Sequence, residues 1–308
     1  MAEAIKIQGL TKVYQSRLVK GQVVAVDNLH LEVQQGEIFG FLGPNGAGKT
    51  TTIKMLLGLL FPTSGTASIL GKPIGDIEAK KEISYLPESP YFYEYMSGRE
   101  VLNFYAKLFR LDNETRTKRV EELLERVGMK YAASKPLREY SKGMLQRIGV
   151  AQALLNDPKI LILDEPTSGL DPIARKDIRD LILELREKGK TVFLSSHQLQ
   201  EVEMVCDRVS IIDQGKLRKI GSLNDLLAKG GMEVTATRVN SDLAEQISKI
   251  AGRVEQTDKT LVAYHDDEKE AEKIIKLIMD GGASLVSVQP ARRTLEHLFV
   301  ETVKEDKK

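Results

Sequence analysis

The sequence has a single cysteine, almost no net charge and no long apolar run, and each shortage excludes a class of protein. Cys206 alone cannot form an internal disulfide, so a reducing compartment is favoured, and its apolar flanks favour packing over reactivity as a thiol. A formal net charge of +1 over 308 residues argues against a nucleic-acid partner. The N-terminus shows no secretion signal, and no uncharged apolar run reaches the roughly 18 residues that a membrane span needs. Any membrane role is therefore expected to be peripheral, through a partner.

What the chain does contain is the composition of a folded globular protein, with 42% hydrophobic and 29% charged residues. Its length allows more than one domain. Glycines and small residues cluster at Gly221–Gly231. We place a boundary there, between a domain of residues 1–221 and a second domain of residues 222–308.

The first two thirds of the chain alternate short apolar strands with longer amphipathic helices. This order predicts an α/β core around a parallel sheet. The expected strands are Ile5–Gly9, Val23–Val33, Glu37–Gly43, Ile160–Asp164 and Thr191–Ser195, and the expected helices are Lys49–Leu60, Glu100–Phe109, Glu114–Val127, Lys142–Leu155 and Ala174–Lys188.

The last third changes to a second pattern, in which strands and helices follow in the order β-α-β-β-α-β with a final helix. This order predicts a small α+β module of the ferredoxin-like type. The expected strands are Glu233–Val239, Arg253–Gln256, Thr260–His265 and Ser284–Val288, and the helices are Ser241–Ala251, Glu268–Met279 and Arg292–Val303. The charged tail Lys304–Lys308 is expected to fray.

A glycine-rich turn follows an apolar strand and opens a helix, and it fits the pattern G-x-x-x-x-G-K-[ST]. Its residues are Gly43, Pro44, Asn45, Gly46, Ala47, Gly48, Lys49 and Thr50. Consecutive backbone N–H groups and the helix N-terminus then form a phosphate site. Lys49 is expected to reach the β- and γ-phosphates, Thr50 to ligate Mg²⁺ and Thr51 to contact the α-phosphate. The motif alone does not separate a kinase, a GTPase and a transport ATPase.

Two later strands end in polar side chains at the same edge of the expected sheet. Asp164 is placed to hold Mg²⁺, and Glu165 to accept a proton from a water that attacks the γ-phosphate. A merely solvated strand end is the alternative for this pair. His197 follows the next strand, where it either donates a hydrogen bond to the γ-phosphate or caps the strand structurally.

Two further segments are Tyr140–Arg147 (YSKGMLQR) and Ser168–Asp171 (SGLD). With them, residues 3–220 contain motifs in the order that resembles the ABC-type ATPase family. The resemblance implies a P-loop ATPase domain with a helical subdomain at about 88–158, and ATP and Mg²⁺ as cofactors. It also implies a dimer in which Ser141 and Gly143 of one copy contact the γ-phosphate held by the other. Asp171 would contact the second copy, and Tyr14 occupies the position that stacks on adenine. An ordinary strand tyrosine is the alternative for Tyr14.

Two positions depart from the family pattern. Lys142 and Met144 replace the second and fourth residues of the usual Ser-Gly-Gly-Gln signature, and Glu88 replaces a glutamine expected after Tyr85-Leu86-Pro87. Both variants resemble the exporter branch called ABC-2 type, whose ATPases serve drug, sodium, lipid and polysaccharide export. Glu88 is expected to reach Mg²⁺ or the attacking water, but a carboxylate cannot donate as an amide does.

An aromatic segment, Ser89–Met96, directly follows Glu88. By resemblance this region, Glu88–Met96, receives an integral membrane permease subunit. An interface is favoured for these aromatics, although they could instead fill the core of the helical subdomain. The resemblance thus implies a cytoplasmic ATPase at the inner face of the cell membrane, paired with a second copy or a closely similar subunit.

Two other functions fit the phosphate loop. One is a soluble ABC ATPase that acts on nucleic acid or ribosomes, but a coiled-coil insertion or a second ATPase domain is missing and the net charge is near zero. The other is a kinase or GTPase, for which the signature and SGLD segments have no purpose. The transported cargo cannot be inferred, because it would contact the membrane subunit.

Overall fold

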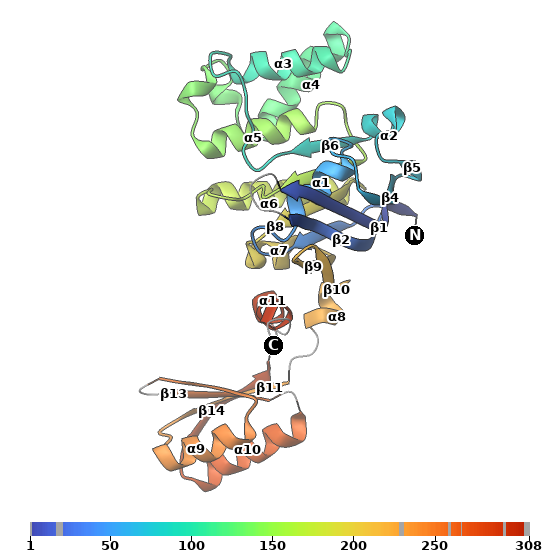
Figure 1. Cartoon of the computed structure of the whole chain (residues 1–308). Helices are drawn as coiled ribbons and strands as arrows, with labels where there is room; N and C mark the ends of the chain where they lie inside the picture. The colour runs from blue at the N-terminus through green and yellow to red at the C-terminus, as the bar shows by residue number, and fades with distance from the viewer. Residues whose placement is uncertain are drawn as a thin grey trace. The chain divides into compact units, whose positions relative to one another are not determined.

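The computed structural model describes residues 2–16, 21–227, 231–257, 260–265, 267–291 and 294–304 (Figure 1). The chain divides into two compact units, Met1–Ser222 and Leu223–Lys308. Part of the expected boundary (228–230), the start of the last expected helix (292 and 293) and most of the expected tail (305–308) lie outside the described residues. Within the described part, no helix is long and apolar enough to cross a membrane.

The first unit contains a six-stranded sheet in the order β10-β9-β3-β8-β7-β6. All neighbouring strands are parallel except β10, which pairs antiparallel with β9. The strands are β3 (Ile38–Leu42), β6 (Ile83–Leu86), β7 (Ile160–Asp164), β8 (Thr191–Ser196), β9 (Arg208–Asp213) and β10 (Lys216–Ser222). Every residue of β3, β7 and β8 is buried, as expected for central strands covered on both faces. The predicted α/β class is confirmed.

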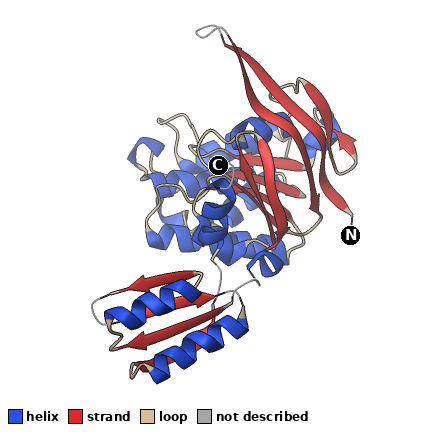
Figure 2. Cartoon of the chain, turned by 60° about the horizontal axis from the view of Figure 1, so that its bottom comes forward, coloured by secondary structure: helices blue, strands red, loops and turns tan. Residues whose placement is uncertain are grey.

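A second, antiparallel sheet has the order β2-β1-β4-β5. Its strands are β1 (Glu3–Ser16), β2 (Gly21–Gln34), β4 (Ser64–Ile69) and β5 (Lys72–Pro73). Figure 2 shows β1 and β2 as a long hairpin at the N-terminal side of this unit. A single buried core joins this sheet to the parallel one and to helix α1 (Lys49–Leu56), through residues such as Ile5, Phe41, Ile53 and Phe193. The phosphate loop is therefore supported from both sheets.

Helices complete the first unit. They are α2 (Ile77–Lys81), α3 (Gly98–Leu108), α4 (Asn113–Arg126), α5 (Lys142–Ala153), α6 (Pro172–Glu187) and α7 (Leu199–Val205), with short 3₁₀ turns at Lys130–Ala132 and Leu137–Glu139. Ser97 begins α3 with a capping box that includes Glu100. Arg147 of α5 pairs with Asp177 of α6. The helical segment around α3–α5 is thus tied to the helix that joins β7 to β8.

The prediction was wrong at several strands and at one helix end, and it missed the short helices α2, α7 and α8 (Leu223–Leu227). The strand at Ile5–Gly9 is only part of β1, and β4, β5, β6, β9 and β10 were not predicted. Helix α1 stops at Leu56 rather than at Leu60, because Gly58 adopts the left-handed conformation (φ 66°) that ends helices. Cys206 is buried, and burial raises the pKa of its thiol, which confirms a packing role.

The second unit follows the predicted order. Strands β11 (Met232–Thr237), β12 (Arg253–Gln256), β13 (Thr260–His265) and β14 (Ser284–Pro290) form an antiparallel sheet in the order β12-β13-β11-β14. Helices α9 (Ser241–Ile250) and α10 (Glu268–Asp280) cover one face of it (Figures 1 and 2). Short α8 (Leu223–Leu227) precedes this sheet and α11 (Leu295–Lys304) follows it. This strand order is the ferredoxin-like one that the sequence predicts.

Candidate active site

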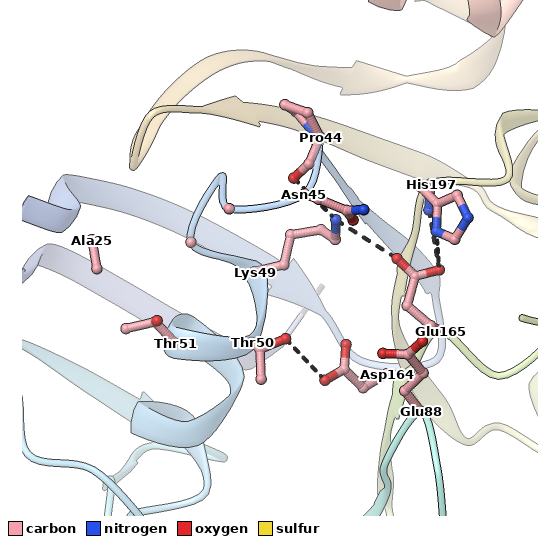
Figure 3. Close-up of a pocket in the computed structure, with 12 residues that line it drawn as sticks. Ala25, Pro44, Asn45, Lys49, Thr50, Thr51, Glu88, Asp164, Glu165 and His197 are labelled. Carbon is pink, nitrogen blue, oxygen red and sulfur yellow. Dashed lines mark hydrogen bonds and ion pairs between the residues drawn. The ribbon is translucent and has the colours of Figure 1, made fainter.

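A pocket of about 380 Å³ lies where the phosphate loop meets the carboxyl ends of β7 and β8 (Figure 3). The parallel sheet brings these segments together although more than 100 residues of sequence separate the loop from β7. The pocket is lined by Ala25, Pro44, Asn45, Gly46, Gly48, Lys49, Thr50, Thr51, Glu88, Asp164, Glu165 and His197. Most of the predicted site residues therefore surround one cavity, and Ala25 of β2 is an addition that the sequence did not indicate.

The phosphate loop is shaped by glycines at positive φ. A Cβ on Gly48 (φ 104°) would lie 2.3 Å from the carbonyl oxygen of Ala25, so only glycine fits there. A Cβ on Gly46 (φ 81°) would meet no atom within 4 Å, because this residue faces open space at the pocket. The Lys49 ammonium donates to the carbonyl oxygen of Gly43 at 2.6 Å. The loop and the N-terminus of α1 thus form a cationic cradle for an anion.

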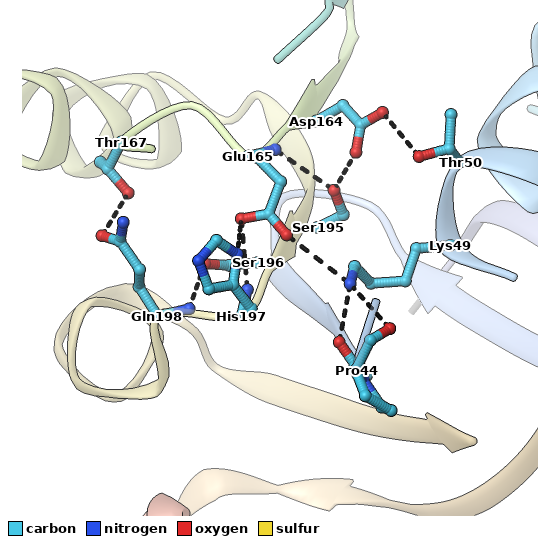
Figure 4. Close-up of polar contacts among 11 residues, drawn as sticks. Pro44, Lys49, Thr50, Asp164, Glu165, Thr167, Ser195, Ser196, His197 and Gln198 are labelled. Carbon is cyan, nitrogen blue, oxygen red and sulfur yellow. Dashed lines mark hydrogen bonds and ion pairs between the residues drawn. The ribbon is translucent and has the colours of Figure 1, made fainter. Parts of the chain in front are cut away.

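Asp164 is buried at the end of β7, and three hydroxyl groups approach its carboxylate. Ser195 donates to Oδ1 at 2.5 Å from the neighbouring strand β8 (Figure 4). Thr50 lies 3.3 Å from Oδ2, and the Tyr85 hydroxyl lies 3.5 Å from the same oxygen. The parallel register pairs Asp164 with Ser195, which explains the first contact. These hydroxyls stabilise a charged carboxylate away from bulk water.

Glu165 is held in a fixed orientation between two groups that can carry positive charge. Its Oε1 lies 3.6 Å from Lys49 Nζ, and its Oε2 lies 2.8 Å from His197 Nδ1. The backbone N–H of His197 also donates to Oε2, at 3.2 Å (Figure 4). The residue has φ 49°, a strained conformation for a non-glycine residue, and its own N–H donates to the Ser195 carbonyl at 3.0 Å. The side chain is thus aimed at the pocket by its surroundings.

Tyr85 and Ser195 contact the site although the sequence did not single them out. Tyr85 is half-buried on β6, and burial, together with the charges of Asp164 and Glu88, raises the pKa of its phenol to about 12. The signal for Ser195 was its place at the polar end of a buried strand, opposite Asp164 in the register. Tyr85 gave no such signal, because an aromatic residue in a short strand is typical of packing.

The oxygen ligands in the pocket fit a magnesium ion. Thr50 and Asp164 lie together, and the exposed Glu88 lines the same cavity. No group of three or more histidine, cysteine, aspartate or glutamate side chains among the described residues forms a metal site by itself. Magnesium bound with a nucleotide needs only one or two carboxylates, because phosphates and water supply its other oxygens. The donor set is therefore the kind that magnesium uses beside a triphosphate.

Six predicted residues do not line the pocket of their own chain. Ser141 is the N-cap of α5, and its Oγ accepts from the N–H of Met144 at 3.3 Å. Gly143 is in the first turn of the same helix, and Asp171 caps α6 by accepting from Ala174 at 2.9 Å. Ser141 and Asp171 are exposed. Tyr14 is 40% exposed on β1, with the Lys12 ammonium 5.3 Å from its ring centroid. Gly43 and Ala47 are buried within the loop.

The aromatic segment after Glu88 is divided between surface and core. Tyr91, Tyr93 and Tyr95 are 87%, 55% and 73% exposed. Phe92 is only 8% exposed and packs edge-on against Tyr105, with ring centroids 6.3 Å apart. The expectation that Tyr91 and Phe92 both belong to a surface was wrong for Phe92, because this ring fills the core of the helical segment.

Comparison with known proteins places the chain among transport ATPases. Residues 26–168 match the family model described as ABC transporter. The chain is 38% identical over 310 residues to the bacitracin transport ATP-binding protein BcrA of Bacillus licheniformis, covering 98% of each chain. It is 38% identical over 263 residues to the Nod factor export ATP-binding protein I of Cupriavidus metallidurans, covering 83% of this chain and 87% of that one. Among solved structures, the chain is similar to a dimeric ATP-binding cassette in a post-hydrolysis state bound to ADP and Pi. The two share 26% sequence identity with a TM-score of 0.65, and the match covers 71% of this chain and 98% of that one.

Proposed function

The chain belongs to the ABC transporter family as an ATP-binding subunit with ATPase activity, and from this premise we propose that two copies close around MgATP to drive a separate membrane permease. The observation that supports the closed dimer is the incompleteness of each copy. The phosphate loop, Glu165 and His197 line the pocket, whereas Ser141, the N-cap of α5, does not line the pocket of its own chain. Each pocket therefore lacks a cap that a second copy can supply.

In the proposed mechanism the phosphate loop binds ATP through its backbone N–H groups and Lys49. Thr50, Asp164 and Glu88 would hold Mg²⁺, which neutralises charge that develops on the phosphates during transfer. Glu165 accepts the proton of the attacking water, since its carboxylate lines the pocket and is oriented by His197. His197 is half exposed at the pocket and donates to the γ-phosphate. Tyr14 stacks on the adenine ring.

The second copy contributes the N-terminus of α5. Ser141 and the N–H groups of its first turn form an anion site, and Asp171 makes contacts between the copies. Lys142, which departs from the family signature, leaves this tip open. The Lys142 ammonium lies beside Gly169 of its own chain. A Cβ built on Gly169 would be only 2.5 Å from Lys142 Nζ. The departure is therefore compatible with binding of a γ-phosphate by Ser141 and Gly143.

The relatives support the proposal of a permease partner and of an export direction. Two relatives are named for bacitracin transport and for Nod factor export, and the variants at Glu88, Lys142 and Met144 resemble the ABC-2 type exporter branch. We infer an exporter whose ATPase subunits lie on the cytoplasmic face of the membrane and contact the permease at Glu88–Met96. The same relatives favour a transporter over an ATPase that acts on nucleic acid or ribosomes.

The contact with the permease is tested by removing exposed rings only. Tyr91→Ala with Tyr95→Ala removes two tyrosines that are 87% and 73% exposed, so folding should be unaffected. We expect basal ATPase activity within about twofold of the wild type and loss of permease from the purified complex, because large exposed rings dominate such interfaces. Co-purification from membranes and ATPase assays measure both properties.

The matched control is Tyr131→Ala, which removes a ring that is 74% exposed in the same helical segment but outside Glu88–Met96. This variant should retain the permease. If the double variant co-purifies with the permease as the control does, the assigned contact surface is wrong.

A further inference from the structure

The contacts of Asp164 include one that phosphate-loop chemistry does not require. Oδ1 is bound by Ser195, and Oδ2 has two hydroxyl neighbours, Thr50 at 3.3 Å and Tyr85 at 3.5 Å. Thr50 belongs to the phosphate loop and is expected to serve the metal. Tyr85 comes from β6, a strand with no residue among the predicted catalytic or metal-binding groups.

Tyr85 is anchored so that its hydroxyl can face the end of β7. Residues Ile83, Ser84 and Leu86 of β6 are buried, and the Tyr85 ring packs against the main core of the unit. In the parallel register Tyr85 lies opposite Ile162, two residues before Asp164. The phenol is long enough to reach forward from that position to the carboxylate, as the 3.5 Å contact shows.

A packing role explains the ring of Tyr85 but does not explain its hydroxyl. Phenylalanine would fill the same space without placing a polar atom in a half-buried position near two carboxylates, Asp164 and Glu88. A phenol is protonated at neutral pH, so the Tyr85 hydroxyl can donate to Oδ2 of Asp164 at 3.5 Å. A donor aimed at Asp164 restricts the rotation of the carboxylate that would hold the metal.

We propose that Tyr85 is a positioning residue that fixes Asp164 for metal binding and links it to the permease-contact segment. The inference rests on the proposed function, because it assumes that Asp164 serves Mg²⁺. Strand β6 ends at Leu86, two residues before Glu88, and the exposed tyrosines follow directly. A shift of Glu88–Met96 therefore acts on the same strand that holds the Asp164 carboxylate through Tyr85. Tyr85 itself touches neither nucleotide nor water in this scheme.

The test is Tyr85→Phe, which keeps the ring and removes only the hydroxyl. We expect the Mg²⁺ concentration at half-maximal binding of a fluorescent methylanthraniloyl ATP to rise about three- to tenfold, which lies in the range for loss of a hydrogen bond of ordinary strength. Binding of the same nucleotide in EDTA should be unchanged, since the phosphate loop is intact. ATP turnover at saturating Mg²⁺ should stay within about twofold, because Thr50 and Glu165 remain.

Tyr105→Phe is the matched control, because it removes the hydroxyl of a partly buried tyrosine that packs against Phe92 and Phe104. An unchanged Mg²⁺ midpoint in Tyr85→Phe would overturn the proposal, and so would an equal loss of binding in EDTA. A different result would contradict the proposed function itself. In that case the wild-type protein would bind the nucleotide without any dependence on Mg²⁺.

Discussion

Replacing Glu165 by glutamine should slow ATP hydrolysis by about 10²–10⁴-fold, the usual contribution of a general base, while ATP stays bound. Glutamine has nearly the same shape, so the contacts at the end of β7 can persist. Its amide oxygen still accepts from the backbone N–H of His197, as Oε2 does at 3.2 Å. It cannot take a proton from water. Single-turnover kinetics and sedimentation in MgATP measure the loss of turnover and the trapped two-copy state.

The matched control for this variant is Glu88→Gln, which changes another carboxylate that lines the same pocket. It restores the amide that the family usually has at this position, so hydrolysis should continue. The assignment of Glu165 as the base would be wrong if Glu165→Gln remained monomeric in MgATP and hydrolysed it at the wild-type rate.

Two inactive variants should restore activity to one another when they are mixed. Lys49→Met removes the cation that contacts the phosphate loop and Glu165, and Gly143→Asp places a negative charge at the tip of α5. A Cβ at Gly143 has its nearest neighbour at 3.5 Å, an ordinary contact, so the second variant should fold. Each variant alone inactivates both ATP sites of a symmetric dimer, because every site contains the altered residue.

A mixed dimer has one doubly damaged site and one intact site, because the intact loop of one copy faces the intact helix tip of the other. Equal amounts should therefore recover at most about a quarter of the wild-type rate if copies pair at random and sites act independently. Steady-state ATPase assays over a range of mixing ratios measure this recovery. Mixtures that stay inactive at every ratio would show that each chain forms its site alone.

The sequence predicted the parts of the site that depend on local patterns. The phosphate loop and the acids after β7 lie at strand ends, and the parallel sheet brings those ends together. The ferredoxin-like order of the second unit also followed from periodicity and turn residues. Asp164 and Glu165 were identified because adjacent carboxylates are unexpected at the end of a buried strand.

The features that the sequence did not predict depend on tertiary contacts. Strand β6 has only four residues and one polar side chain, so its periodicity is too short to detect. The contact between Tyr85 and Asp164 needs the parallel pairing of β6 with β7, which no local pattern specifies. Tyr91 and Phe92 are adjacent aromatic residues that the sequence does not distinguish. Tyr91 is exposed, whereas Phe92 is buried because its ring packs against Tyr105.

The central claim is that the α5 tip of one copy closes the nucleotide pocket of another, and cross-linking tests it directly. Cys206 is the only cysteine and is buried, so Cys206→Ala gives a background without thiols. In that background, Asn45→Cys on one chain and Ser141→Cys on another introduce exposed thiols at the pocket and at the tip. With Glu165→Gln in both chains, a short bismaleimide should join the two chains in MgATP and not without nucleotide. Equal cross-linking with and without MgATP, or none in either case, would contradict the account.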